Sequence, residues 1–422
     1  MHIQPGGSIR GRLRPPSDKS LTHRAVIFSS LANGDSVVRN PLLGEDCRAT
    51  MEIFRAMGVS VEVGEEVRIS SNGHLNSPAK PLDCGNSGTT MRLLCGVLAG
   101  REGLETTLVG DESLSRRPMA RVAQPLRLMG ADIQGDQAPL VIRGRKLNGI
   151  RYVSPVASAQ IKSALLLAGL QAEGETWVTE PAKSRNHTEN MLQFLGVQVL
   201  EDGDLTVGVR GGAAWKGAEY DIPADISSAA FWLVAALICP GSNLILEEVG
   251  TNPTRSGILD VLVDSGAGIM DMNSRSAMGE NVEDLQVSHN QDLRAFTIEG
   301  DLVPRLIDEI PILAVLATQC HGRTVIRDAQ ELKVKESDRI AKMTEGLNAM
   351  GAKVEATKDG MIIHGPTRLR GAHIEADGDH RIAMSFVIAG LIAEGETTLS
   401  GAETIATSYP SFWDDLRRLR AN

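Results

Sequence analysis

Residues 15–34 read PPSDKSLTHRAVIFSSLANG, a stretch that begins with charged side chains and continues with mainly apolar ones. From Ala25 to Ala32 the apolar content predicts a helix that is buried on all sides. Because charges are costly in a protein core, Lys19, Ser20 and Arg24 are expected where the start of this helix meets a cleft. Helix N-termini present free N–H groups and a positive dipole end, so the pattern indicates an anionic ligand.

The same layout recurs along the chain. Each copy has a polar entry, then about three apolar turns, then a glycine that ends the helix. A second marker, a helix that ends in glycine before a strand, alternates with the first, and both return roughly every 70 residues, which indicates a repeat architecture. The further copies of the first marker lie at 85–100, 157–174, 224–241, 307–322 and 378–395.

The repeats also predict how the chain closes. Each is expected to contain a strand, the apolar helix, a second strand, a second helix and a hairpin, but the sixth ends at Asn422 without its hairpin. The N-terminal segment 8–20 matches 149–160 in its position before a helix, so its strand should pack with the C-terminal half. We expect an α/β fold of two similar domains with three repeats each.

The predicted boundaries follow from this closure. One domain is expected to comprise 16–224 and the other to join 1–15 to 225–422, with a cleft between them. The alternative is an open solenoid, but solenoids carry polar capping repeats and none is visible. The weakest order is expected in 273–292, which is polar and longer than its counterparts.

Composition excludes several classes of protein. The chain has 422 residues, of which 42% are hydrophobic and only 3% aromatic, so its core must use small and aliphatic side chains that permit close helix packing. The net charge of −10 argues against a general nucleic-acid binder. The five scattered cysteines form no CxxC pair, which argues against a disulfide framework or a zinc site. No signal peptide or membrane span is expected, so a soluble, cytoplasmic protein is predicted.

Taken singly, the polar motifs at the helix entries have plain structural interpretations. DKSLTHR could be an N-terminal turn with a solvated lysine, and GNSGTTMR (85–92) could be a simple turn, since it lacks the spacing of a Walker loop. ASAQ (157–160) could hold only a capping serine, and KVKESDRIAK a solvated helix face. Asp225 is interpreted as a helix cap without a chemical role.

Taken together, six motifs in order resemble the 5-enolpyruvylshikimate-3-phosphate synthase family of enolpyruvyl transferases over nearly the whole chain. They are DKSLTHR, GNSGTTMR, SRRP (115–118), ASAQ, KESDR (335–339) and DHR (379–381). The resemblance implies two domains of three inverted α/β units, with buried parallel helices and outer sheets. It implies transfer of enolpyruvyl from phosphoenolpyruvate to the 5-hydroxyl of shikimate 3-phosphate, with no metal or organic cofactor. A monomer that binds these two small molecules, and neither nucleic acid nor membrane, is expected.

The resemblance also assigns residues to the two substrates. Arg116 is expected to face solvent, and His23, His187 and Glu189 to be structural. The residues expected to bind phosphoenolpyruvate are Lys19, Asn86, Gly88, Arg117, Gln160, Arg339 and Arg381. Those expected to bind shikimate 3-phosphate are Ser20, Arg24, Ser158, Ala159, Gln160, Arg185, Asp308 and Lys335.

Three residues are predicted to carry the chemistry. Asp308 stands at the mouth of a buried helix, where a carboxylate can take the hydroxyl proton, and Glu309 is the less favoured candidate. The resemblance gives Glu336 the exchange of protons at C3 of phosphoenolpyruvate and places Lys19 near the bridging oxygen. Lys335 and Arg339 are expected one helical turn apart on one face, with Glu336 beside them.

Two departures bear on the assignment. Some family members carry a lysine where this chain has Thr407, so that position is left out of the site. The related UDP-N-acetylglucosamine 1-carboxyvinyltransferase typically has a cysteine in the loop before its Arg-Pro, whereas 110–118 here contains none, which disfavours that alternative. A non-enzymatic repeat scaffold would not place acid–base side chains at buried helix entries. The resemblance further predicts inhibition by glyphosate at the phosphoenolpyruvate site.

Overall fold

The computed structural model describes residues 1–420 as two compact units. Unit 1 comprises Met1–Pro16, Pro223–Arg275 and Asn281–Asn422, and unit 2 comprises Ser17–Ile222 with Ser276–Glu280. The grouping of Ser276–Glu280 with unit 2 differs from the expectation that all of 225–422 lies in one domain. Its cause is local: Met278 is buried in the core of unit 2, and Glu280 contacts His187 of that unit.

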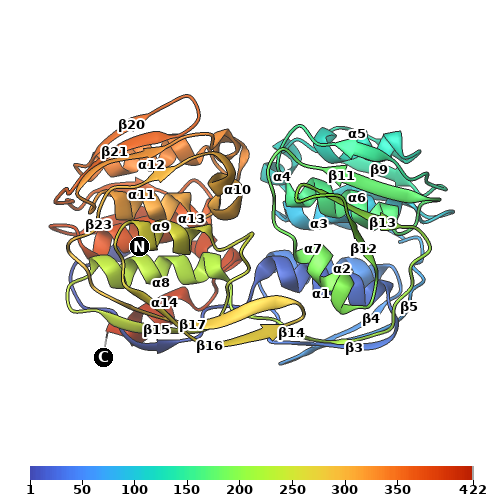
Figure 1. The fold of residues 1–422 in the computed structure, drawn as a ribbon, viewed down its shortest axis with the longest axis horizontal. Helices are drawn as coiled ribbons and strands as arrows, with labels where there is room; N and C mark the ends of the chain where they lie inside the picture. The colour runs from blue at the N-terminus through green and yellow to red at the C-terminus, as the bar shows by residue number, and fades with distance from the viewer. Residues whose placement is uncertain (421–422) are drawn as a thin grey trace. The chain divides into compact units, whose positions relative to one another are not determined.

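Unit 2 is built around three buried helices, α1 (Lys19–Leu31), α3 (Gly88–Ala99) and α6 (Ala159–Gly169). Figure 1 shows helices and sheets packed together within the unit. The other helices are α2 (Glu45–Ala56), α4 (Glu112–Arg116), α5 (Ala120–Leu128) and α7 (His187–Phe194). As the apolar stretch at 25–32 predicts, α1 is buried from Leu21 to Ser30 on every side.

Each sheet of unit 2 has four strands in one repeated topology, with the first two strands parallel and the later pairs antiparallel. The first sheet is β14 (Glu219–Asp221), β3 (Asn33–Arg39), β5 (Val67–Asn72) and β4 (Ser60–Val63). The second is β6 (Leu82–Asp83), β7 (Glu105–Val109), β9 (Leu140–Arg143) and β8 (Asp132–Gln134). The third is β10 (Arg151–Val153), β11 (Glu175–Thr179), β13 (Thr206–Arg210) and β12 (Val199–Glu201).

Unit 1 repeats this plan around α8 (Ile226–Ile238), α11 (Ile310–Ala317) and α13 (His380–Leu391), in which every residue is buried. Its other helices are α9 (Gly257–Asp264), α10 (Val303–Leu306), α12 (Arg339–Ala349) and α14 (Phe412–Arg420), with 3-10 helices η1 (Gly300–Leu302), η2 (Gln330–Val334) and η3 (Ala402–Thr407). One sheet is β18 (Thr297–Ile298), β19 (Gly322–Ile326), β21 (Met361–Gly365) and β20 (Lys353–Ala356).

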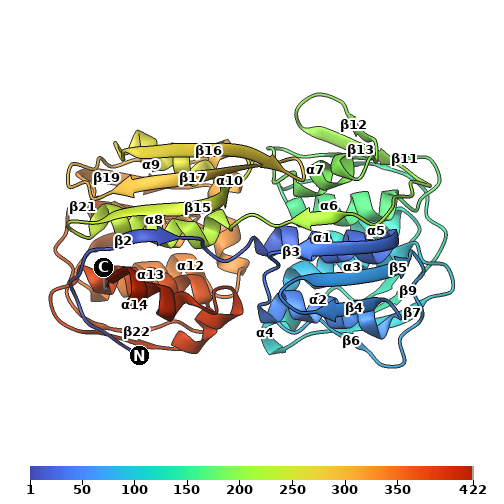
Figure 2. The ribbon, with the colours of Figure 1, turned by 90° about the horizontal axis from the view of Figure 1, so that it is seen from below.

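The other two sheets of unit 1 are completed by the N-terminus. The N-terminal strand packs with the C-terminal half, as predicted: β2 (Arg10–Leu13) pairs in parallel with β15 (Asn243–Gly250), and Figure 2 shows the two strands side by side. This sheet continues through β17 (Glu280–Ser288) to β16 (Ile269–Ala277). The last sheet holds β22 (His373–Glu375), β23 (Thr397–Ser400) and β1 (His2–Ile3), so β1 supplies a strand that the sixth repeat lacks.

The segment expected to have the weakest order, 273–292, mainly forms strands β16 and β17. That expectation was wrong because most of β16 is exposed, so its polar side chains belong to the outer surface of a sheet and not to a loop. The alternating burial of β17 shows the ordinary period of a half-buried strand.

Small side chains allow the buried helices to pack closely, as the low aromatic content predicts. A Cβ added at Gly96 of α3 would lie 2.1 Å from the carbonyl oxygen of Ala164 in α6, so only glycine lets the two helices approach so closely. The five cysteines are buried and unbridged. Within residues 1–420, no helix combines the length and the apolar character needed to cross a membrane.

Candidate active site

The entry of α1 supplies the first predicted site residues of unit 2. Asp18 caps the helix by accepting a hydrogen bond from the Leu21 N–H at 2.7 Å. Lys19 Nζ lies 2.9 Å from Asp46 Oδ2, and its side chain stays 18% exposed, so the ammonium is oriented yet accessible. His23 is fully buried against Thr50, and burial lowers its pKa to about 3, which keeps it neutral and confirms its structural role.

Arg24, one helical turn beyond Ser20, is held more firmly than the sequence suggested. Its Nε donates to Thr188 Oγ1 and its Nη2 to Ser163 Oγ, both at 2.8 Å, while Nη1 reaches the Ser20 carbonyl oxygen at 3.0 Å. Burial lowers the pKa of Arg24 to about 10, against the opposing attraction of nearby carboxylates, so it remains a cation at neutral pH. The charge of Arg24 therefore sits at a fixed place next to Ser20.

A group that we call the anion cluster forms around the start of α3: Asn86, Gly88, Arg92, Arg117 and Gln160. Arg117 Nη2 donates to Asn86 Oδ1 at 2.8 Å, and the Asn86 amide donates to Asp111 at 2.7 Å. Arg92 Nη1 donates to Gln160 Oε1 at 2.6 Å. Gly88, the first residue of α3, adjoins both guanidinium groups. Two arginines beside a helix N-terminus provide a site for a carboxylate or a phosphate.

The sequence prediction missed Arg92, the last residue of GNSGTTMR. It is only 8% exposed and lies four residues after Gly88, a helical spacing that returns its side chain to the start of α3. This i,i+4 relation was the available signal. Arg116, by contrast, is exposed and pairs with Glu112, as predicted.

Replacing Gly88 with alanine should weaken phosphoenolpyruvate binding roughly tenfold or more, the cost of a mild steric misfit. The new Cβ would lie 2.9 Å from Arg92 Nη1 and 3.3 Å from Arg117 Nη1, so the two cations must move while the backbone stays in place. The melting temperature should therefore change little. Steady-state kinetics give KM for phosphoenolpyruvate. The same titration repeated at several glyphosate concentrations gives Ki for glyphosate, which should rise in parallel.

Gly268→Ala is the matched control for this variant. Its Cβ would meet no atom within 4 Å, and unchanged kinetics are expected. An unaltered KM in the Gly88 variant would contradict the placement of the donor substrate at the anion cluster.

The predicted phosphate-binding residues lie at the entries of α6 and α7. Ser158 caps α6, accepting from the Ile161 N–H, and Ala159 begins the helix. Gln160 donates to Thr89 at 3.0 Å and accepts from Arg92, which joins α6 to the anion cluster. Arg185 lies just before α7, on the segment that leads from β11.

In unit 1 the predicted residues converge on Asp308, which lies two residues before α11. Lys335 Nζ and Arg339 Nη1 approach Asp308 Oδ1 at 3.2 and 3.4 Å, and Arg381 Nη2 lies 4.0 Å from Oδ2. Arg381 also donates to the backbone oxygen of Asp308 at 3.3 Å. Asp308 is 13% exposed, so its carboxylate lies among these cations and stays accessible to a substrate.

Arg339 is the centre of what we call the carboxylate cluster: Asp308, Glu336, Arg339 and Asp379. It contacts Asp379 at 2.8 Å and Glu336 at 2.6 Å, and its side chain is 1% exposed. Burial alone would lower its pKa, but the attraction of Asp379 and Glu336 is stronger and raises it. Asp379 also caps α13 by accepting a hydrogen bond from the Arg381 N–H.

Lys335 and Arg339 do not lie on one helix face, so that expectation was wrong. Asp338 accepts from the Ala341 N–H and thereby starts α12 at Arg339, while Lys335 has extended backbone after η2. The two cations still meet at Asp308 because the loop between them folds toward it.

Glu309, the less favoured candidate for taking the hydroxyl proton, lies in a buried ion pair. It is fully buried, and its Oε2 lies 2.7 Å from Arg255 Nη1. Arg255 Nη2 also lies 3.6 Å from Asp225, which caps α8, as predicted.

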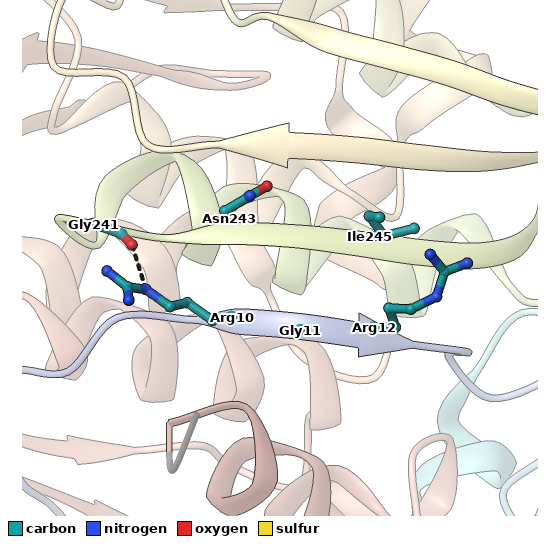
Figure 3. A pocket seen from close by; sticks show the side chains of 6 residues that line it. All are labelled: Arg10, Gly11, Arg12, Gly241, Asn243 and Ile245. Carbon is teal, nitrogen blue, oxygen red and sulfur yellow. Dashed lines mark hydrogen bonds between the residues drawn. The ribbon is translucent and has the colours of Figure 1, made fainter.

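A separate surface hollow of about 480 Å³ lies on the sheet of unit 1 and contains none of the predicted residues. Figure 3 shows Arg10 and Arg12 on one strand of its lining. Gly241, Asn243 and Ile245 lie along the neighbouring segment. Arg10 donates to the Gly241 carbonyl and Arg12 to Glu247, so both guanidinium groups have partners. We assign it no catalytic role. Among residues 1–420 no group of three or more His, Cys, Asp or Glu side chains is placed to hold a metal.

Comparison with known proteins identifies the family. The family model for EPSP synthase (3-phosphoshikimate 1-carboxyvinyltransferase) matches residues 3–416. Proteins named 3-phosphoshikimate 1-carboxyvinyltransferase from Synechococcus sp. (strain RCC307) and Brevibacillus brevis are each 52% identical to this chain, over 98% of both chains and 99% of both chains respectively.

Solved structures lead to the same family. The EPSP synthase from Acinetobacter baumannii superposes with a TM-score of 0.89 at 44% identity, covering 99% of this chain and 98% of that one. The enolpyruvyl transferase NikO from Streptomyces tendae has the same fold, with a TM-score of 0.80 at 19% identity over 99% of this chain and 96% of that one. On the family match and these full-length relatives, the chain belongs to the EPSP synthase family of enolpyruvyl transferases.

Proposed function

We propose that the chain transfers the enolpyruvyl group of phosphoenolpyruvate to the 5-hydroxyl of shikimate 3-phosphate, releasing phosphate and 5-enolpyruvylshikimate 3-phosphate. This is a step of the shikimate pathway toward chorismate and the aromatic amino acids. The observation that carries the proposal is Asp308, a partly exposed carboxylate contacted by Lys335 and Arg339 and adjoined by Arg381. That arrangement can deprotonate a hydroxyl while it attracts an anionic substrate.

The substrates are assigned to the clusters by charge. The anion cluster, with Lys19 from unit 2 and Arg339 and Arg381 from unit 1, takes phosphoenolpyruvate. Shikimate 3-phosphate takes its phosphate contacts from Ser158, the Ala159 N–H, Arg185 and Lys335, and its ring contacts from Ser20, Arg24, Gln160 and Asp308.

The chemistry proceeds by addition and elimination. Asp308 takes the proton of the 5-hydroxyl as its oxygen adds to C2 of phosphoenolpyruvate, and a proton is delivered to C3. The tetrahedral adduct then loses a C3 proton and phosphate, which restores the double bond. Glu336 is assigned to C3 and Lys19 to the bridging oxygen of the leaving phosphate.

One assay decides between this reaction and that of UDP-N-acetylglucosamine 1-carboxyvinyltransferase. Phosphate release from phosphoenolpyruvate should require shikimate 3-phosphate and should not occur with UDP-N-acetylglucosamine. The names of the relatives that are about half identical support the first acceptor. A cytoplasmic, monomeric enzyme completes the proposal, and light scattering of the purified chain measures its oligomeric state.

Glu336→Gln should abolish exchange of solvent protons into C3 of phosphoenolpyruvate and lower kcat by about 10²–10⁴. Glutamine keeps an oxygen toward Arg339, so both substrates should still bind. Incorporation of tritium from water into recovered phosphoenolpyruvate measures the exchange. Glu345→Gln, on the exposed side of α12, is the control and should exchange normally. Full exchange in the Glu336 variant would remove this residue from the proton transfers.

A further inference from the structure

Lys162, in the second turn of α6, is a buried cation that the proposed chemistry does not use. Its side chain is 2% exposed, and its Nζ lies 2.9 Å from Glu180 Oε2 and 2.8 Å from Glu189 Oε1. The ammonium also donates to the backbone oxygen of Ser184 at 3.3 Å. Three oxygens match the three donors of an ammonium group. Burial lowers the pKa of Lys162, but the two glutamates outweigh it and raise the pKa.

Glu180 connects this cation to the backbone of the proposed phosphate site. It follows β11 and is 4% exposed. Its Oε1 accepts from the Ser158 N–H at 3.0 Å, and its Oε2 accepts from the Ser184 N–H at 3.4 Å. One carboxylate thus holds both the residue that caps α6 and the segment that carries Arg185.

Glu189 adds a third anchor from α7. Glu189 is 5% exposed and lies in the first turn of α7. Its Oε1 contacts Lys162 Nζ at 2.8 Å. Its neighbour Thr188 accepts from Arg24 and contacts Ser163 at 2.6 Å. Buried polar contacts therefore join the entries of α6 and α7 to α1.

We propose that Lys162, Glu180 and Glu189 form a positioning triad that sets the separation of Ser158 and Arg185 and so tunes this site for the phosphate of its acceptor. The inference rests on the proposed function, because it presumes that these two residues bind the 3-phosphate. An isolated buried ion pair is expensive, and a buried ammonium between two carboxylates persists where neighbouring groups depend on its geometry. None of the three side chains needs to touch substrate.

The test uses the full chain with two variants, Lys162→Met and Lys162→Met/Glu189→Gln. The double variant removes one positive and one negative charge, so its net charge equals that of the parent. It provides a folded protein if the unpaired glutamates prevent the single variant from folding. Calorimetry gives Kd for shikimate 3-phosphate, and competition gives Ki for shikimate, which lacks the phosphate. The first constant should rise about tenfold to a hundredfold, the usual cost of a misplacement near 1 Å. The second should change less than twofold.

Two controls separate positioning from general damage. Lys146→Met removes an exposed ion pair with Glu173 in the same unit and should leave both constants unchanged. Ile133→Ala truncates a buried residue of β8 and should lower the melting temperature without changing the ratio of the two constants. Lys162→Arg keeps the charge and should partly restore phosphate binding.

The outcomes distinguish the inference from the proposed function beneath it. If Arg185→Ala weakens shikimate 3-phosphate binding and the folded Lys162 variants do not, the triad has no positioning role. Equal losses for shikimate and its phosphate would also refute it. If Arg185→Ala and Ser158→Ala leave binding of shikimate 3-phosphate intact, the phosphate site itself is misassigned.

Discussion

Asp308→Asn should lower kcat by about 10²–10⁴, the range ascribed to a single general base. Asparagine keeps the size of the side chain and one oxygen toward Lys335 and Arg339, which approach Asp308 Oδ1 at 3.2 and 3.4 Å. It cannot accept a proton, so the loss should fall on the chemical step and not on substrate binding. Single-turnover measurement of phosphate release separates the two.

The split between kcat and KM gives this variant a second readout. KM for both substrates should stay close to that of the parent chain while kcat falls. Asp301→Asn, at an exposed position of unit 1, is the matched control and should behave as the parent chain. A variant that keeps at least half of the parental kcat would assign the hydroxyl proton to another group.

Arg339→Met should destabilise unit 1 by about 3–5 kcal/mol, the cost of removing one partner from a buried ion pair. Its side chain is 1% exposed and contacts Asp379, Glu336 and Asp308, so its loss leaves several carboxylates close together without their shared cation. The sequence alone suggests that such a variant loses activity while its fold survives, because it places the charge on the ligand. The burial of Arg339 changes that expectation, and urea unfolding at pH 7 measures the cost.

The pH dependence of this loss has a definite sign. Burial would raise the pKa of Asp379, but Arg339 outweighs it and lowers the pKa, so this carboxylate stabilises the folded parent above its unfolded pKa and loses that effect as pH falls. Without Arg339, burial dominates and protonation relieves the repulsion. The difference in unfolding free energy between parent and variant should therefore shrink from pH 7 to pH 5.

Arg368→Met controls for the loss of a cation in general. Arg368 is 91% exposed and lies 3.8 Å from Glu394, so its removal should cost at most about 1 kcal/mol, independent of this pH range. A difference for the Arg339 variant that stays constant with pH would show that lost packing, and not the carboxylate cluster, causes its instability.

The parts of the fold that sequence predicts are those set by local rules. Asp18, Asp225 and Asp379 each precede an apolar run and each caps a buried helix in the structure. Counting the strands of the repeats predicted that the N-terminal strand packs with the C-terminal half, where β2 pairs with β15. Asp308 was found because a charged side chain at the start of an apolar helix is rare enough to stand out, whereas Arg339 was assigned through the family resemblance.

The features that sequence missed depend on contacts between distant segments. Lys162 looks like an ordinary helix residue until Glu180 and Glu189 meet it from other elements. The expectation for Lys335 failed for a local reason: the four-residue spacing placed it on one helix with Arg339, but Asp338 caps α12 and starts it at Arg339. Strand β16 looks like a loop because its outer face is polar, and only pairing with β17 makes it a strand.

The hairpin of β16 and β17 also constrains the order in which the two units can fold during translation. Its tip, Ser276–Glu280, folds with unit 2: Met278 enters the core, and Glu280 Oε1 contacts His187 Nδ1 at 2.9 Å, with both side chains almost fully buried. A ribosome that has finished Ile222 has therefore not yet made all of unit 2. That unit cannot reach its final packing until translation has passed residue 280, and an isolated 17–222 fragment would expose His187 and a gap in its core to solvent.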